Sequence, residues 1–141
     1  VARPGSVRVE ALFEIETLPT VHHLVSTVTA VVAEGSGPAD MLDAAFPPGS
    51  ITGAPKHQAM KVIAGLEPPR GPWCGTLLVL DDAGSLRSSV LIRTAAFVRD
   101  GAGDWRFRTL AGAGIVADSD PQAELEETDA KIEAIRTALI G

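Results

Sequence analysis

Apolar and β-branched residues predict strands in the first part of the chain, followed by a short helix. Residues 7–16 (VRVEALFEIE) alternate in part between apolar and polar side chains, which predicts one or two short strands. Residues 22–33 (HHLVSTVTAVVA) are apolar and β-branched, as expected of a buried strand. Residues 38–45 open with proline, which is favoured at the first position of a helix, and we expect a short helix there.

A loop rich in glycine and proline leads into a second predicted helix. The loop covers residues 46–54, and the helix runs from Pro55 to about residue 66. The apolar positions at helical spacing are Met60, Ile63 and Leu66. Free N–H groups at this helix start, beside the hydroxyls of Ser50 and Thr52, would suit a carboxylate or another anion. A simple turn is the alternative interpretation.

The second half of the chain changes to a β pattern and ends in a helix. Strands are predicted at roughly 73–81, 86–98 and 104–110, with Asp-Asp-Ala-Gly and Asp-Gly-Ala-Gly-Asp as the hairpin turns. Asp120 followed by proline is a capping signal for a final helix that reaches about Leu139. These patterns predict an α+β fold with a mainly antiparallel sheet and flanking helices.

Composition narrows the class of protein. The 141 residues are one domain's worth of chain, able to bury a modest core, and 45% hydrophobic with 21% charged residues is ordinary for a soluble globular protein. A net charge of −6 with no basic cluster argues against nucleic-acid binding. The single cysteine, Cys74, excludes a disulfide framework and is assigned to packing. Without a signal peptide or a membrane-spanning run, we expect a cytosolic protein. The abrupt start at Val1 predicts the interior of a longer polypeptide.

The final helix carries the first candidate site. Glu124, Glu127 and Lys131 fall within about 60° of one another around the helix axis. They adjoin an apolar stripe formed by Leu125, Ile132, Ile135 and Leu139. Two interpretations stay open: a solvated acidic turn in which Glu127 pairs with Lys131, or a carboxylate pair that projects into a cleft and binds Mg²⁺.

Three further positions could contribute to catalysis or ligand binding, and the histidine and the arginine each have a purely structural explanation as well. His23 lies in an apolar strand pattern, as a core histidine or as a catalyst. Arg93 follows apolar residues and needs an anionic partner, which is either an ion pair within the protein or a ligand. Gly112 and Gly114 interrupt an apolar stretch and would let backbone N–H groups approach a ligand's carboxylate. That stretch lacks the third glycine of a dinucleotide-binding fingerprint.

Five segments in this order resemble the chorismate-utilising enzymes, and the resemblance covers essentially the whole chain. The segments are SITGAPK (50–56), LEPPRGPWCG (66–75), IRT (92–94), AGAGIVADS (111–119) and ELEETDAK (124–131). The resemblance implies part of that family's α/β sandwich. Residues 1–141 match the C-terminal portion of its catalytic domain.

The resemblance also implies roles for individual residues. The metal ligands for Mg²⁺, which holds a carboxylate of chorismate, would be Glu124 and Glu127. The residues that contact the substrate's carboxylates would be Arg93 and Lys131, and the catalytic residue near the reacting side of the ring would be His23. The residues that line the substrate site would be Ser50, Thr52, Gly53, Trp73, Gly112 and Gly114.

Within the family, SITGAPK together with Trp73-Cys74-Gly75 is most similar to the aminodeoxychorismate synthase component I branch. In that branch, ammonia from a glutamine amidotransferase partner replaces the 4-hydroxyl of chorismate on the way to p-aminobenzoate and folate. Anthranilate synthase component I and the isochorismate or salicylate synthases are the alternatives within the family. From a different class, the chain could be a non-catalytic remnant that binds an anion or a partner subunit.

The family resemblance has two consequences for the isolated chain. The family's upstream portion carries further acidic metal ligands and a PIKGT-type motif whose lysine is the proposed nucleophile, so we expect these 141 residues alone to be inactive. Half a sandwich also leaves apolar sheet surface uncovered, and we expect the chain to bury that surface by self-association.

Overall fold

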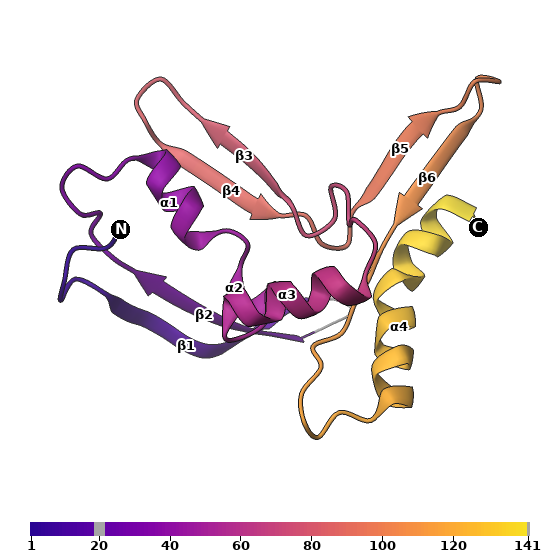
Figure 1. Ribbon diagram of the computed structural model, residues 1–141, viewed down its shortest axis with the longest axis horizontal. Helices are drawn as coiled ribbons and strands as arrows, with labels where there is room; N and C mark the ends of the chain where they lie inside the picture. The colour runs from indigo at the N-terminus through magenta and orange to yellow at the C-terminus, as the bar shows by residue number, and fades with distance from the viewer. Residues whose placement is uncertain (19–21, 141) are drawn as a thin grey trace. The chain divides into compact units, whose positions relative to one another are not determined.

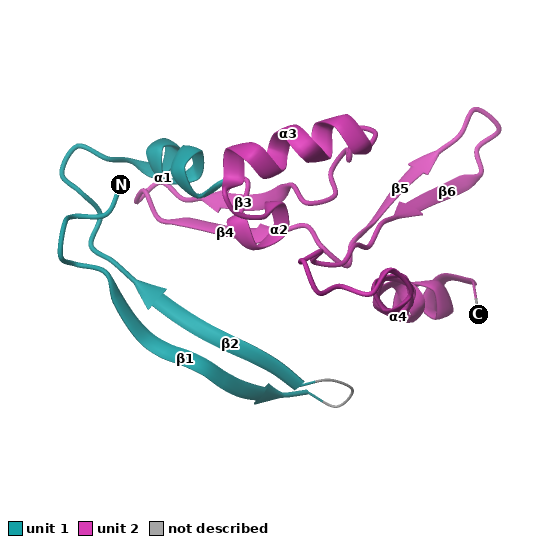
Figure 2. Cartoon of the chain, turned by 60° about the horizontal axis from the view of Figure 1, so that its bottom comes forward, with its two compact units in different colours: residues 1–46 teal, residues 47–141 magenta. Residues whose placement is uncertain are grey.

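The computed structural model describes residues 1–18 and 22–140 and divides the chain into two compact units. The first unit spans Val1–Phe46 and the second spans Pro47–Gly141, as the two colours of Figure 2 show. Each unit combines helices with antiparallel strands, so the predicted α+β class is confirmed.

The first unit is a β-hairpin followed by a short helix (Figure 1). Strand β1 (Arg8–Thr17) pairs antiparallel with β2 (His22–Thr29), and helix α1 (Pro38–Ala45) has the predicted bounds. The first predicted segment is therefore a single strand, although its register shifts twice between Val9 and Glu14. Phe13 absorbs the irregularity with a φ of 52°, and its N–H donates to the Ser26 hydroxyl at 3.1 Å.

The second unit begins with two helices. The predicted loop 46–54 was wrong in part, because helix α2 (Gly49–Thr52) forms a single turn within it. Helix α3 (Lys56–Leu66) begins one residue later than expected, with Pro55 as its N-cap. The carbonyl of Pro55 accepts the N–H groups of Gln58 and Ala59 at 3.1 and 3.0 Å.

Two antiparallel hairpins follow. They are β3 (Thr76–Leu80) with β4 (Leu86–Val90), and β5 (Ala95–Arg99) with β6 (Trp105–Thr109). Both predicted turns are confirmed. The predicted single strand over 86–98 was wrong, because β4 ends at Val90, the backbone pairing stops after Leu91, and Arg93 takes a left-handed φ of 51°.

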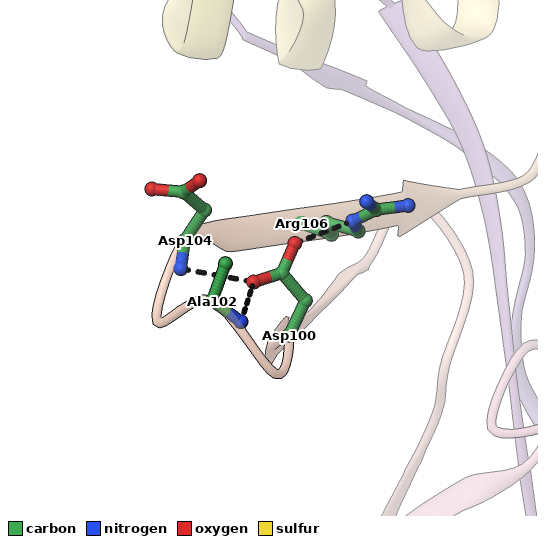
Figure 3. A network of polar contacts seen from close by, with 4 residues as sticks. All are labelled: Asp100, Ala102, Asp104 and Arg106. Atoms are coloured by element: carbon green, nitrogen blue, oxygen red, sulfur yellow. Dashed lines mark hydrogen bonds and ion pairs between the residues drawn. The ribbon is translucent and has the colours of Figure 1, made fainter.

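The turn between β5 and β6 is closed by one carboxylate (Figure 3). Asp100 Oδ1 accepts the N–H groups of Ala102 and Asp104 at 3.0 and 3.1 Å, and its Oδ2 accepts from Arg106 Nε at 2.9 Å. These donors hold the pKa of Asp100 below its ordinary value, with the Arg106 side chain as the largest cause.

Helix α4 (Pro121–Ile140) closes the chain, one residue longer than predicted. Asp120 caps it as expected, because its Oδ1 accepts the N–H of Ala123 at 2.9 Å. No helix in the described ranges has both the length and the apolar character needed to cross a bilayer.

The expected modest core was wrong for this structure. Within residues 1–18 and 22–140 no side chain is fully buried, and strand residues such as Leu24 and Leu77 are 69% and 64% exposed. The physical reason is the sheet topology: the described strands form three separate two-stranded ladders. A two-stranded ladder needs a second layer against its apolar face before that face is removed from water.

Candidate functional site

The candidate site is a cavity of about 290 Å³ within the second unit. Its wall comes from α2, from the segment after α3, from the link between β4 and β5, from the segment after β6, and from α4. The lining residues are Ser50, Ile51, Glu67, Arg70, Trp73, Cys74, Ile92, Arg93, Leu110, Ala111, Gly112, Ala113, Gly114 and Lys131. All five segments that carry the family resemblance therefore contribute residues to this cavity, and the last segment contributes Lys131.

Two left-handed residues shape this wall. Cys74 and Leu91 extend the β3–β4 ladder, since the Cys74 N–H donates to the Leu91 carbonyl and the Leu91 N–H to the Gly75 carbonyl, both at 2.9 Å. Cys74 and Arg93 take φ values of 61° and 51°, so the two segments turn at the end of this ladder. A non-glycine residue in this region costs on the order of 1 kcal/mol, and such strain often gathers at binding sites.

Arg93 is an unpaired cation in the cavity wall. Its side chain is exposed, and it forms no hydrogen bond or ion pair with any residue that the structure describes. The two alternatives for Arg93 were an internal ion pair and a ligand. The first is absent from residues 1–18 and 22–140, which leaves the guanidinium open to an anion.

Lys131 reaches the same cavity from α4. Its Nζ forms an ion pair with Glu127 Oε1 and donates to the Gly112 carbonyl at 3.1 Å. The predicted pairing of Glu127 with Lys131 is therefore present. Because the Lys131 side chain is only 28% exposed, its ammonium group is held in the wall and does not swing freely in solvent.

Glu124 is held differently from Glu127. Its Oε1 accepts the Ser119 hydroxyl at 2.5 Å, and Ser119 Oγ in turn accepts the Val116 N–H at 3.0 Å. The other oxygen, Oε2, is buried and has no hydrogen-bond partner among the residues that the structure describes. Glu124 lines a second cavity of about 450 Å³, which shares Arg70 and Trp73 with the first. A buried carboxylate oxygen without a partner is costly, so this position favours a bound cation.

The remaining predicted lining residues are placed as follows. Ser50 lines the cavity, whereas the Thr52 hydroxyl donates to the Pro48 carbonyl at 2.9 Å. Gly53 has a φ of 113°, and a Cβ there would lie 3.1 Å from the Cβ of Ala59. Its requirement for glycine is therefore explained by local packing.

The two glycines of the 111–115 segment differ. A Cβ at Gly112 would lie 3.3 Å from Trp73 Cη2, so the close approach expected there is made to the indole ring. A Cβ at Gly114 would meet nothing within 4 Å, which leaves open space beside it in the cavity.

His23 belongs to the first unit, outside the residues that line the cavity. It lies on β2 opposite Glu16 of β1 and is half-buried, whereas its neighbour His22 is exposed. The alternation expected of this pair is present. The catalytic role of His23 stays a prediction.

Comparison with known proteins decides the family. Residues 1–137 match the model of the chorismate binding enzyme family. The chain belongs to this family.

Relatives of known sequence and structure agree with the assignment. The chain is 51% identical over 136 residues to aminodeoxychorismate synthase component 1 of Klebsiella aerogenes, and 46% identical over 140 residues to anthranilate synthase component 1 of Streptomyces coelicolor. These alignments cover 96% and 99% of the chain but only 29% and 26% of the relatives. The structure resembles anthranilate synthase component I of Streptococcus pneumoniae, with a TM-score of 0.78 and 34% identity over 92% of this chain and 29% of that one. The chain thus spans less than a third of the length of each.

Two carboxylates of α4, those of Glu124 and Glu127, are the candidate ligands for a divalent cation. The described residues contain no group of three or more His, Cys, Asp or Glu side chains arranged to hold a metal. Glu124 and Glu127 remain, one with a buried free oxygen and the other half-exposed. Mg²⁺ is usually bound through one or two carboxylates together with water and substrate oxygens, so two ligands are sufficient.

Sequence reasoning missed an ion pair in the cavity wall. Arg70 Nε and Nη2 donate to the two carboxylate oxygens of Glu67 at 2.6 and 2.8 Å, and the Arg70 guanidinium lies over the Trp73 ring, 4.9 Å from its centroid. The pairing lowers the pKa of Glu67 and raises that of Arg70, while burial raises the pKa of the Cys74 thiol. The available signal was the Glu-x-x-Arg spacing inside the LEPPRGPWCG motif. Ser119 was missed as well, although it precedes the Asp120 cap directly.

Proposed function

We propose that this chain is the chorismate-binding part of an aminodeoxychorismate synthase component I, which converts chorismate and ammonia to 4-amino-4-deoxychorismate. The observation that carries the proposal is the unpaired Arg93 in a cavity that also receives Lys131. Chorismate carries two carboxylates and an apolar ring. The higher identity to the aminodeoxychorismate synthase relative supports this branch of the family.

Each cation would do a different part of the binding. The planar guanidinium of Arg93 can donate two parallel hydrogen bonds to one carboxylate. Lys131 offers a compact charge, held in place by Glu127 and the Gly112 carbonyl. The indole of Trp73 provides a flat surface for the ring of chorismate. Ser50 lines the same cavity, although it belongs to a different one of the five sequence segments.

We place Mg²⁺ at Glu124 and Glu127. When bound, the ion supplies positive charge for a carboxylate of the substrate. Glu124 contributes the carboxylate oxygen that lacks a partner, and Ser119 fixes the orientation of that carboxylate through its hydroxyl. Glu127 contributes a half-exposed carboxylate whose charge Lys131 partly balances.

The proposal has four further parts, of which the first three follow from the family resemblance. His23 acts near the reacting side of the ring, and a glutamine amidotransferase subunit or domain supplies the ammonia. The sequence contains no PIKGT-type motif, so we expect the isolated chain to bind chorismate without turning it over. We expect the enzyme to be cytoplasmic.

The second candidate is anthranilate synthase component I. It is supported by the structural likeness to the Streptococcus pneumoniae protein and by the 46% identity to the Streptomyces coelicolor protein. Both candidates bind the same substrate, so binding alone does not separate them. The product does.

A chimera tests the proposal. This chain replaces the matching 136 residues of the Klebsiella aerogenes component 1, and the purified chimera is given chorismate, Mg²⁺ and ammonium ions in place of the amidotransferase. We expect 4-amino-4-deoxychorismate, and its loss in the Arg93→Gln chimera. Formation of anthranilate would favour the second candidate. A folded chimera that makes neither product would contradict both.

A further inference from the structure

The ion pair between Glu67 and Arg70 lies where it can control the shape of the cavity. Glu67 is the C-cap of α3, and its N–H donates to the Ile63 carbonyl at 2.9 Å, so the carboxylate is fixed to the end of a helix. Arg70 binds both oxygens of that carboxylate, and its side chain is only 22% exposed. A bidentate arginine of this kind has a defined plane and direction.

That plane lies over the indole of Trp73. The guanidinium carbon is 4.9 Å from the ring centroid, within the range of a cation–π interaction. The far edge of the same ring, at Cη2 and Cζ2, lies 3.3 and 3.5 Å from the position that a Cβ on Gly112 would take. The guanidinium therefore lies over the ring, and the far edge of the ring faces Gly112 so closely that any side chain at that position would meet it.

Arg70 and Trp73 also line three separate cavities of the second unit. These are the cavities of about 290 and 450 Å³ and a small one of about 30 Å³. A side chain that borders several cavities determines how they are divided from one another. Movement of the indole would join spaces that it now separates.

The pair also distinguishes Arg70 from the other cations of the cavity. The Nε–Nη2 edge of Arg70 is fully used by Glu67, whereas Arg93 has no partner among residues 1–18 and 22–140. Arg70 is therefore suited to hold a neighbour in place, and Arg93 is suited to bind an anion.

We propose that Arg70 is a positioning residue: together with Glu67 it holds the Trp73 ring against Gly112 and so sets the shape of the cavity that binds chorismate. The identity of the ligand rests on the proposed function, but the clamp on Trp73 does not. Lysine cannot replace arginine here, because it lacks both the fork and the flat face.

The test measures the indole and the ligand separately, in the full chain. Trp105→Phe leaves Trp73 as the single tryptophan and keeps an aromatic ring beside Arg99. In this background Arg70→Lys, Arg70→Met and Gly112→Ala are compared by tryptophan emission and acrylamide quenching. Affinity for chorismate with Mg²⁺ is then measured by titration calorimetry.

The matched control is Arg136→Lys. Arg136 forms the same bidentate pair with Glu133, at the same spacing and with distances of 2.9 and 3.0 Å, but no aromatic ring is recorded beneath it in the described structure. We expect both Arg70 variants to shift the Trp73 emission to longer wavelength and to weaken chorismate binding by about two- to thirtyfold, the range that a cation–π contact spans. Arg136→Lys should change neither. Gly112→Ala should displace the ring without any change of charge.

The outcomes separate the two proposals. Unchanged emission and quenching in Arg70→Met would overturn the clamp, whatever happens to the ligand. A shifted emission with unchanged chorismate affinity would overturn the positioning role and leave the proposed function intact. If the unsubstituted chain fails to bind chorismate, the proposed function fails, and the indole signal still decides whether Arg70 holds Trp73. Circular dichroism of Gly112→Ala guards against a variant that does not fold.

Discussion

Replacing Glu124 with glutamine should leave the stability of the metal-free protein nearly unchanged and abolish its response to magnesium. In the structure Glu124 Oε1 accepts the Ser119 hydroxyl, while Oε2 is buried without a partner. Glutamine keeps an acceptor for Ser119 and puts a neutral group where the unpartnered charged oxygen lies.

The magnitude follows from two opposed effects. An unsatisfied buried polar atom costs about 1–3 kcal/mol, and more when it is charged. Against this, Glu124 lies in the first turn of α4, where a negative charge gains about 0.3–1 kcal/mol from the helix dipole. The amide group of glutamine is itself polar and finds no partner there, so the substitution removes only the extra cost of burying a charge. The free energy of unfolding without metal should therefore change by less than about 1 kcal/mol. With Mg²⁺ at a hundred times its dissociation constant, the unsubstituted chain gains about 2.7 kcal/mol that the variant lacks.

Urea unfolding with and without Mg²⁺ measures both quantities. Glu126→Gln is the matched control, because Glu126 lies on the same helix but is exposed and bonds only Gln122 among the recorded contacts, at 2.9 Å. The control should keep the magnesium response. The reasoning is refuted if Glu124→Gln loses more than about 1 kcal/mol without metal, or if Mg²⁺ stabilises it as much as the unsubstituted chain.

Three other predictions follow. Lys131→Met keeps the length of the side chain but removes its donor, and calorimetry should show chorismate binding weakened by about ten- to a hundredfold; unchanged affinity would remove Lys131 from the site. The pKa of Asp100 is lowered in the folded protein, so its carboxylate stabilises the β5–β6 turn above the unfolded pKa and loses that effect as the pH falls through the folded pKa. Hydrogen exchange of the Ala102 amide should lose its protection in that pH range, and a protection that does not change with pH would count against the network of Figure 3. Because apolar strand residues are exposed, sedimentation should show self-association that grows with concentration, and a monomer throughout would contradict this.

Local signals in the sequence were sufficient for most of the elements. Helix α1 has the predicted bounds, the two aspartate- and glycine-rich turns connect the expected strands, and Asp120 caps α4. Each of these depends on a few neighbouring residues, such as a proline at a helix start or a carboxylate at an N-cap. Such signals can be read from one segment alone and do not depend on contacts with another segment.

Features set by contacts between segments were not predictable in the same way. The left-handed φ of Arg93 divides what reads as one strand, and nothing in the apolar run before it marks the break. The absence of a core among the described residues depends on how ladders are layered, which composition does not encode.

The site was predictable only to the level of residue types. Helical spacing placed Glu124 and Glu127 on one side of α4, but it could not tell that Lys131 takes Glu127 while Glu124 keeps a free oxygen. The contact of Arg70 with Trp73 is tertiary, although both residues lie in one motif. Family resemblance supplied roles, and the structure supplied the partners of each group.

The most direct test of the account is calorimetric titration of chorismate into this chain, with and without Mg²⁺, repeated with Arg93→Gln. We predict binding that strengthens with Mg²⁺ and falls by about ten- to a hundredfold in the variant, since Arg93 is the unpaired cation in the cavity wall. Equal affinity in the variant, or no binding by the unsubstituted chain, would contradict the claim that this cavity is a preformed chorismate site.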